Sequence, residues 1–323
     1  MNFVIAEIIA HGAAVKELHL RREDGAPLAP WQPGSHIVLK FAGPDGAAYE
    51  NHYSLVGAPL AADSYRIAVL REENGKGGSR CLHTHMAAGM AVDVDGPFDG
   101  FPLAPAASAI AGFAAPHAPR TVLVAGGIGI TPLVSMAHAL SARGAPFDLH
   151  YLVSSRDRLA LLDEVQAIDH ARVVVHVSGD TGRVDLGSLL GDFAAGDSVY
   201  ACGPSAMLQA LEAAAAQRGW PAGAVHVESF GARVQQDDAA LTIELTLSDF
   251  TLEVKPGTTI LDALIAAHVM VSYDCKRGEC GSCYVDVLEG EAQHRDVCLT
   301  PAQRAQGMCT CVSWGKGKLV LEL

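Results

Sequence analysis

Four cysteines near the C-terminus have a spacing that could hold an iron–sulfur cluster. Cys275, Cys280 and Cys283 form a C-x4-C-x2-C run, and Cys311 follows at a distance. This is the plant-type arrangement for a [2Fe–2S] cluster, in which each iron needs two thiolates beside the bridging sulfides. Glycines within the run let its backbone take angles closed to other residues. A structural zinc ion is the alternative, but zinc sites usually show paired Cys-x2-Cys knuckles. The pattern therefore predicts an electron-transfer protein.

A glycine-rich turn predicts a nucleotide site. Segment 126–132 joins a strand predicted at Thr121–Ala125 to a helix predicted at Pro132–Arg143. Such glycines let backbone N–H groups approach a pyrophosphate at a helix N-terminus. The spacing is not G-x-G-x-x-G, so a tight turn without a ligand stays open as an alternative. The candidate residues are Gly126, Gly127, Gly129, Thr131 and Pro132, with Cys202, Gly203 and Pro204 at the end of a later predicted strand.

Two motifs in the first hundred residues could hold an aromatic cofactor that carries a phosphate. In segment 51–55, Asn-His-Tyr-Ser-Leu, Tyr53 can stack on a ring system and the Ser54 hydroxyl can hydrogen-bond a ring nitrogen. In segment 77–80, Gly-Gly-Ser-Arg, backbone N–H groups, a hydroxyl and a guanidinium could bind a phosphate. Taken singly, a core tyrosine and an ordinary capped loop explain these motifs equally well.

The elements around these motifs follow three patterns. The first hundred residues show short predicted strands with turn signals, including Ile37–Phe41 and Tyr65–Leu70, which indicate a small barrel. From Thr121, strands and helices alternate, which is typical of a doubly wound α/β domain. The further elements predicted there are strands at Phe147–Val153, Arg172–Val177, Ser198–Cys202 and Val225–Val227, and helices at Leu159–Ile168 and Ser205–Arg218.

The last 85 or so residues read as a compact ferredoxin-like unit of about the usual size for a small domain. Leu241, Ile243, Leu245 and Leu247 alternate as in a half-buried strand. A helix capped by Thr258 or Thr259 is predicted to run through Ala267, and a capping box at Thr300–Gln303 predicts another helix start. The predicted division is a barrel at 1–104, a linker or insertion at 105–119, a doubly wound domain at 120–230, a linker at 231–240 and a cluster-binding domain at 241–323.

Composition narrows the class of protein. The formal net charge of −13 argues against nucleic-acid binding. The N-terminus lacks the basic region of a signal peptide, and no run of apolar residues suits a membrane span. Since four cysteines are assigned to a cluster, a reducing cytoplasm fits better than a disulfide-forming compartment. Cys81, Cys202 and Cys298 are expected to be small packed or surface residues.

Taken together, the motifs resemble the phthalate dioxygenase reductase family, and particularly its vanillate O-demethylase reductase members. The resemblance covers nearly the whole chain, in the order flavin barrel, nicotinamide domain, ferredoxin domain. It is carried by Tyr53–Leu55, Gly77–Ser79, Phe101–Leu103, Gly126–Pro132, Cys202–Pro204, Glu228–Phe230 and the C-terminal cysteines.

This resemblance implies FMN in the barrel, NADH on the α/β domain and Phe230 near the flavin and nicotinamide. Tyr53, Ser54 and Phe230 are the expected catalytic residues. The expected cofactor-binding residues are Asn51, His52, Tyr53, Ser54, Ala68, Val69, Leu70, Gly77, Gly78, Ser79, Arg80, Gly126, Gly127, Gly129, Thr131, Pro132, Cys202, Gly203, Pro204, Glu228 and Phe230. The residues alone leave Cys309 and Cys311 as alternatives for the fourth cluster ligand. The resemblance favours Cys311, which directly precedes Val312-Ser313.

Two features depart from the family pattern. Asn51 stands where relatives commonly carry the arginine that holds the flavin phosphate, and segment 104–118 is longer than the usual link.

The order of motifs nevertheless predicts electron flow from NADH through FMN and the cluster to an outside oxygenase, such as a Rieske-type protein, since a flavin can take two electrons and release them singly. In segment 154–158, two arginines and two serines could receive the 2′-phosphate of NADPH, but Asp157 between the arginines would repel it. NADH is therefore expected over NADPH. The alternatives are a cytochrome P450 or other acceptor, or a redox-sensing module.

Overall fold

The computed structural model describes residues 1–59, 63–73, 75, 77–104, 119–230, 238–274, 276–278 and 280–323. The chain divides into two compact units: Met1–Gly203 with Ala210–Val227, and Pro204–Gln209 with Glu228–Leu323. Residues 105–118 and 231–237, which make up most of the linkers predicted at 105–119 and 231–240, lie outside the described residues. Cys275 also lies outside them. Across the described ranges, none of the helices has the length and apolar character needed to cross a bilayer.

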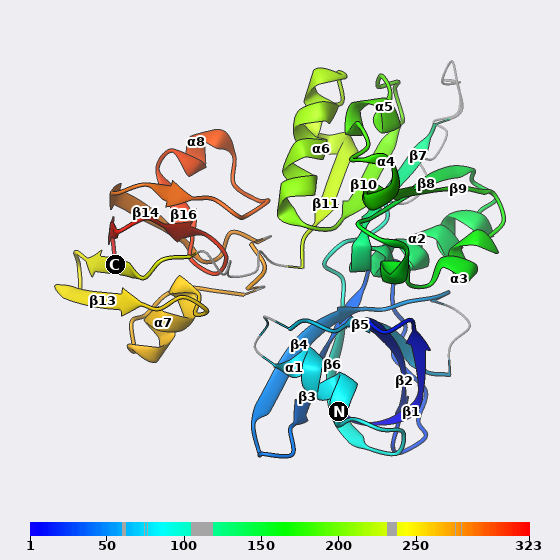
Figure 1. Ribbon diagram of the computed structural model, residues 1–323, viewed down its shortest axis with the longest axis horizontal. Coiled ribbons are helices and arrows are strands. Elements are labelled where there is room, and N and C mark those ends of the chain that lie inside the picture. The colour runs from blue at the N-terminus through cyan, green and yellow to red at the C-terminus, as the bar shows by residue number, and fades with distance from the viewer. Residues whose placement is uncertain are drawn as a thin grey trace. The chain divides into compact units, whose positions relative to one another are not determined.

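An antiparallel barrel forms the N-terminal part of the first unit (Figure 1). Its strands are β1 (Asn2–His11), β2 (Val15–Arg22), β3 (His36–Ala42), β4 (Ala48–Ser54), β5 (Tyr65–Leu70) and β6 (Ala91–Phe98), in the order β4-β3-β6-β1-β2-β5. A bridge between Leu55 and Ile67 brings the end of β4 back to β5. Alternate residues such as Leu18, Leu20 and Ile67 are fully buried, so one face of each strand fills the interior. Helix α1 (Gly78–Thr84) follows β5.

A five-stranded sheet with helices between its strands forms the rest of the first unit. The strands are β7 (Thr121–Gly126), β8 (Phe147–Val153), β9 (Ala171–Val177), β10 (Ser198–Cys202) and β11 (Val225–Glu228), in the order β11-β10-β7-β8-β9. Strands β10, β7, β8 and β9 pair in parallel, as the alternating pattern predicted. The helices are η1 (Gly127–Gly129), α2 (Ile130–Ala142), η2 (Arg156–Arg158), α3 (Leu162–Gln166), α4 (Ser178–Thr181), α5 (Leu186–Leu190), α6 (Ser205–Gln217) and η3 (Ala222–Ala224).

Local geometry corrects two of the predicted elements. The helix predicted at Leu159–Ile168 is shorter in the structure, where α3 begins at Leu162. Leu161 takes φ 57°, and a residue in this left-handed conformation cannot be part of a right-handed helix, so the helix cannot begin before it. Leu247 lies beyond the end of its strand and is 75% exposed, although the alternation predicted it as buried. Helix α5 was not predicted; Asp185 caps it by accepting hydrogen bonds from Gly187 N and Ser188 N.

The barrel and the parallel sheet pack against each other within the first unit. Gly34 N donates to Ser135 Oγ at 2.9 Å, and the rings of Phe101 and Tyr200 meet edge to face with centroids 5.9 Å apart. A Cβ at Gly34 would lie 1.9 Å from the Phe101 carbonyl oxygen, so only glycine fits there. These contacts fix the predicted flavin motifs of the barrel relative to the predicted nicotinamide motifs of the parallel sheet.

The second unit contains a small mixed sheet with two short helices. Its strands are β12 (Leu241–Leu245), β13 (Phe250–Val254), β14 (Tyr284–Glu289), β16 (Gly307–Cys309) and β18 (Lys318–Leu321), in the order β13-β12-β18-β14-β16, beside the pair β15 (Ala292–Gln293) and β17 (Trp314–Gly315). Helices α7 (Ile260–Ala266) and α8 (Pro301–Arg304) begin as predicted: Thr259 accepts from Asp262 N, and Thr300 forms a capping box with Gln303.

Candidate functional site

Two buried hydroxyl groups mark the flavin motif on β4. Tyr53 Oη and Ser54 Oγ have almost no solvent contact and make no hydrogen bond to any described residue. Burial raises the pKa of the Tyr53 phenol, so it stays protonated and can donate. Because buried polar atoms in proteins are normally hydrogen-bonded, these two hydroxyls fit a bound group rich in nitrogen and oxygen acceptors, such as a flavin ring.

The neighbouring strand β5 presents its three predicted residues in different directions. Ala68 packs with the core of the parallel sheet, whereas Val69 lies in the barrel core. Val69 O contacts His83 Nε2 at 2.8 Å. Leu70 is half-buried and packs at the edge of the parallel-sheet core. The side chains of Ala68 and Leu70 therefore face the parallel sheet, and the side chain of Val69 faces the barrel interior.

The predicted phosphate loop lies directly beside Asn51. Gly77 takes φ 98° and precedes α1, and a Cβ at Gly78 would lie 2.3 Å from Asn51 Oδ1. The Asn51 amide therefore packs on the first turn of α1. Ser79 Oγ accepts a hydrogen bond from Glu72 N at 3.0 Å and keeps its own proton to donate. Arg80 is exposed, with its guanidinium near Gly77.

The two predicted nicotinamide motifs come together at one edge of the parallel sheet. Strands β7 and β10 pair so that Ala125 lies opposite Cys202. A Cβ at Gly129 would lie 2.1 Å from the Cys202 carbonyl oxygen and 2.9 Å from Gly203 N, so the two turns touch through backbone. Carboxyl ends of parallel strands are where doubly wound sheets bind ligands.

Within this turn, the residues differ in their contacts. Gly127 takes φ 56° with open space around its Cα, which leaves room for a ligand. Thr131 Oγ1 donates to Ile128 O at 3.0 Å, and Pro132 is buried in the first turn of α2. Gly126 is the last residue of β7. The thirteen-residue α2 thus begins with its N-terminus at the turn.

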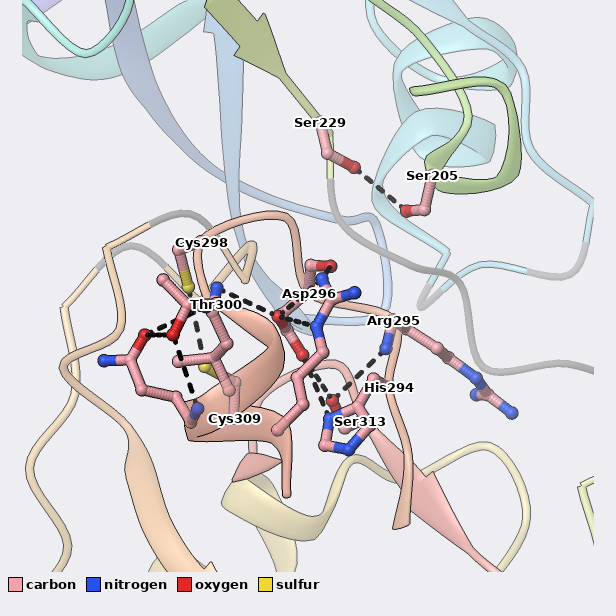
Figure 2. A network of polar contacts seen from close by, with 12 residues as sticks. Ser205, Ser229, His294, Arg295, Asp296, Cys298, Thr300, Cys309 and Ser313 are labelled. Atoms are coloured by element: carbon pink, nitrogen blue, oxygen red, sulfur yellow. Dashed lines mark hydrogen bonds and ion pairs between the residues drawn. The ribbon is translucent and has the colours of Figure 1, made fainter. Parts of the chain in front are cut away.

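The second unit resumes at Glu228, the last residue of β11. Glu228 is 2% exposed, and Phe230 is 39% exposed. The hydroxyls of Ser205 and Ser229 are 3.3 Å apart, and this pair is drawn in Figure 2. Pro204 O accepts from Met207 N and starts α6. Arg277 Nη1 lies 3.6 Å from Glu228 Oε1, and the Arg277 side chain is largely buried.

Buried thiols gather next to the cysteine loop. Cys283 and Cys311 are each 2% exposed, and Cys309 is 0% exposed. Hydrogen bonds from the thiols of Cys309 and then Cys311 lower the pKa of Cys283, which favours its thiolate. Cys280 is exposed, and Cys275 lies outside the described residues. Within the described ranges, no three His, Cys, Asp or Glu side chains form a complete metal site.

The loop backbone has the shape that the glycines predicted. Gly278 and Gly281 take φ 76° and 74°, and a Cβ at Gly278 would lie 2.6 Å from Val312 Cγ2. Thr310 N donates to Cys283 O at 3.1 Å, which holds the loop against the turn that follows β16 and carries Cys311. A thiolate-rich, tightly packed loop of this kind fits an iron–sulfur cluster.

Sequence reasoning missed the buried carboxylate that anchors this region. Asp296 is 0% exposed; Leu299 N, Ser313 Oγ and Arg304 Nη2 donate to it at 3.2, 3.3 and 3.1 Å (Figure 2). Arg295 forms a buried bidentate pair with Asp238. Arg295 and Asp238 are 57 positions apart, so no local pattern indicates that they pair.

Comparisons with known proteins agree with this arrangement. Residues 123–213 match the oxidoreductase NAD-binding domain, and residues 243–314 match the 2Fe-2S iron-sulfur cluster binding domain. The chain is 33% identical to a carnitine monooxygenase reductase subunit of Acinetobacter baumannii, covering 96% of this chain and 93% of that protein. It is 33% identical to a vanillate O-demethylase oxidoreductase of a Pseudomonas species, covering 100% and 98%.

A solved structure of phthalate dioxygenase reductase, described as transferring electrons from pyridine nucleotides to [2Fe–2S], is also similar. It superposes with a TM-score of 0.74 at 34% identity, covering 100% of this chain and 98% of that one. The barrel, the parallel sheet and the C-terminal sheet thus occur in the same order in both. This chain therefore belongs to the phthalate dioxygenase reductase family of oxidoreductases, with an NAD-binding domain followed by a C-terminal 2Fe-2S cluster binding domain.

Proposed function

We propose that this chain is the reductase component that passes electrons from NADH through FMN and a [2Fe–2S] cluster to a terminal oxygenase. The observation that carries the proposal is the presence, in one chain of family length, of two unpaired barrel hydroxyls, two touching nucleotide turns and a set of buried thiols. The relatives described as a carnitine monooxygenase reductase subunit and as a vanillate O-demethylase oxidoreductase support the same role.

In this proposal, the barrel residues hold and orient FMN. A bound flavin accepts two electrons together from a nicotinamide and delivers them one at a time. Tyr53 and Ser54 would hydrogen-bond the ring through their buried hydroxyls, with His52 beside them on β4. Ala68, Val69 and Leu70 would border the ring along β5. The phosphate would lie at Gly77, Gly78, Ser79 and Arg80, with the Asn51 amide at its edge.

The parallel sheet would bind NADH at the joined turns. Backbone N–H groups from Gly126 to Thr131 would face the pyrophosphate at the N-terminus of α2. Cys202, Gly203 and Pro204 would border the nicotinamide side of the site. Glu228 and Phe230 are the remaining residues that we assign to cofactor binding. For hydride transfer, the protein needs to align the two cofactor rings and exclude water from them, and no side-chain acid or base is required.

Cys275, Cys280, Cys283 and Cys311 would hold the cluster. We also propose the functional division 1–104, 120–230 and 241–323, joined by 105–119 and 231–240.

A cytoplasmic location belongs to this proposal, because thiolate ligands persist in a reducing compartment. The electron acceptor would be a Rieske-type oxygenase, which has a higher potential than a plant-type cluster at roughly −400 mV.

Rapid mixing with NADH in the absence of oxygen tests the proposal. We expect the purified protein to contain about one FMN and one cluster per chain. NADH should first bleach the flavin absorbance, and cluster reduction, followed by its visible absorbance and EPR signal, should come after it. A protein without flavin, or one whose cluster stays oxidised with excess NADH, would exclude this function. Acceptor assays with a Rieske oxygenase and a cytochrome P450 would separate the two partner classes.

A further inference from the structure

Two cysteines outside the predicted ligand set have their sulfur atoms in contact. Cys298 Sγ and Cys309 Sγ are 3.7 Å apart, which is contact distance for two thiols (Figure 2). A disulfide bond is about 2.05 Å long, so the two sulfurs need only a small approach to become bonded. No disulfide joins the described cysteines as they stand.

Folded backbone on both sides determines this contact. Cys309 is the last residue of β16 and lies opposite Tyr284 of β14 in the ladder. On the other side, the buried Asp296 carboxylate binds Leu299 N, so the chain on both sides of Cys298 is tied down. Thr300, two residues further, is fixed by its capping box. The two thiols are therefore held facing each other and do not meet by chance motion of a loop.

The two thiols differ in their access to solvent. Cys309 is 0% exposed, whereas Cys298 is only partly buried. A small oxidant in solution therefore reaches Cys298 more readily than Cys309. This is the arrangement of an attacking thiol backed by a resolving thiol.

We propose that Cys298 and Cys309 are a redox-active thiol pair that exchanges with low-molecular-weight disulfides, next to the cluster but separate from its four ligands. Cys298 attacks one sulfur of a small disulfide RSSR; the RSSR bond breaks, a Cys298–SR bond forms, and one RSH leaves with the Cys298 proton. Cys309 then attacks the Cys298 sulfur; the Cys298–Cys309 bond forms, and the second RSH leaves with the Cys309 proton. The protein loses two electrons and two protons, and RSSR gains them.

Peptide mapping of the holoprotein after exposure to oxidised glutathione, without oxygen, tests this pair. We expect a cross-linked peptide containing Cys298 and Cys309, lighter by the two thiol hydrogens, while the cluster absorbance is retained. In Cys309→Ser, exchange should stop at the first step and leave glutathione on Cys298. In Cys298→Ser, Cys309 should stay unmodified because the small disulfide cannot reach it.

Cys81 is the internal control, because it is a buried thiol outside this contact and should remain reduced throughout. Absence of the cross-link in the wild-type holoprotein would overturn the proposal. So would a cross-link that forms only after the cluster absorbance has been lost. Because the wild-type mapping decides by itself, a variant that folds poorly leaves the test intact. NADH-dependent flavin reduction is measured separately, so failure here is distinguishable from failure of the proposed function.

Discussion

Arg66 of the barrel and Glu164 of the parallel-sheet region form a bidentate ion pair. Arg66 Nη1 and Nη2 lie 3.2 and 2.7 Å from the two carboxylate oxygens of Glu164, and Arg66 Nε lies 2.6 Å from Glu17 Oε1. His138 Nε2 adds a contact of 2.8 Å to Glu164. Because β5 carries Arg66 and α3 carries Glu164, one guanidinium joins the two parts of the first unit.

This ion pair predicts a loss of stability in acid. Burial raises the pKa of Glu164, but hydrogen bonds from His138 and Arg66 outweigh it and lower the pKa from 4.5 to about 2. Glu17 has a lowered pKa for the same reason: burial opposes it, and the Arg66 and His11 contacts prevail. A lowered folded-state pKa contributes stability that is present above about 4.5 and lost as the pH falls toward about 2.

Denaturant unfolding at a series of pH values checks this. We expect the wild-type unfolding midpoint to fall steeply within that acid range and Glu164→Gln to show a shallower fall from a lower starting midpoint. Glu50→Gln is the control, because Glu50 is an exposed carboxylate 3.9 Å from Lys40. Parallel acid profiles for Glu164→Gln and the wild type would contradict the role of the ion pair.

Local patterns in the sequence predicted the elements and motifs. They did not predict contacts between residues that are far apart in the chain. Strand β5 has the predicted bounds, because its apolar residues end at clear turn signals. The Thr300–Gln303 capping box is likewise a four-residue signal that needs no tertiary context. Arg66 and Glu164 lie 98 positions apart, and only the folded chain makes them a pair.

Some of the errors have equally local causes. The helix predicted from Leu159 starts late because Leu161 is left-handed, and an apolar leucine gives no hint of that conformation. Asp296 reads as one acidic residue among several charged ones, so its full burial could not be predicted.

Arg80 should hold the FMN phosphate in the absence of a family arginine at position 51. Arg80→Ala is expected to weaken FMN binding roughly tenfold or more, since charge-assisted hydrogen bonds are about twice as strong as neutral ones. Asn51→Arg should keep or strengthen binding, because Asn51 already lies at the first turn of α1. Equilibrium dialysis of the apoprotein with FMN measures this. Arg71→Ala is the control, since Arg71 is an exposed arginine paired with Glu73. Equal affinities of Arg80→Ala and the control would refute the assignment.

Gly129 should be intolerant of any side chain. In Gly129→Ala, the new Cβ would lie 2.1 and 2.4 Å from the carbonyl oxygen and carbon of Cys202, and backbone atoms cannot move aside cheaply. We expect destabilisation of about 3 kcal/mol and weaker NADH binding, measured by thermal unfolding and by titration. Gly223→Ala is the matched control, because nothing lies within 4 Å of its Cβ. A Gly129→Ala protein as stable as this control would show that the two turns are not packed together.

Asp157 should disfavour NADPH. The pKa of its carboxyl is lowered, chiefly by the hydrogen bond from Ser155, so it is charged at neutral pH and would repel a 2′-phosphate. Arg156, one of the two arginines beside Asp157, is engaged with Asp180 at 3.1 Å. We expect kcat/KM to favour NADH, and Asp157→Asn to narrow the preference several-fold. The exposed Asp163→Asn serves as the control. A wild-type preference for NADPH would show this prediction wrong.

Cys311 rather than Cys309 should be the fourth cluster ligand. Both sulfurs lie within hydrogen-bonding reach of Cys283, so proximity alone does not separate them. Their other contacts do: Cys309 Sγ also touches Cys298, whereas Cys311 directly precedes Val312, which packs against Gly278 of the cysteine loop. We expect Cys311→Ser to lose or markedly alter the cluster's visible absorbance and EPR signal, while NADH still reduces the flavin. Cys309→Ser, the matched control, should keep the native signal, because removing a thiol that does not bind iron leaves the ligand set complete. An intact cluster in Cys311→Ser together with a lost one in Cys309→Ser would reverse the assignment, and would also remove Cys309 from the proposed redox pair.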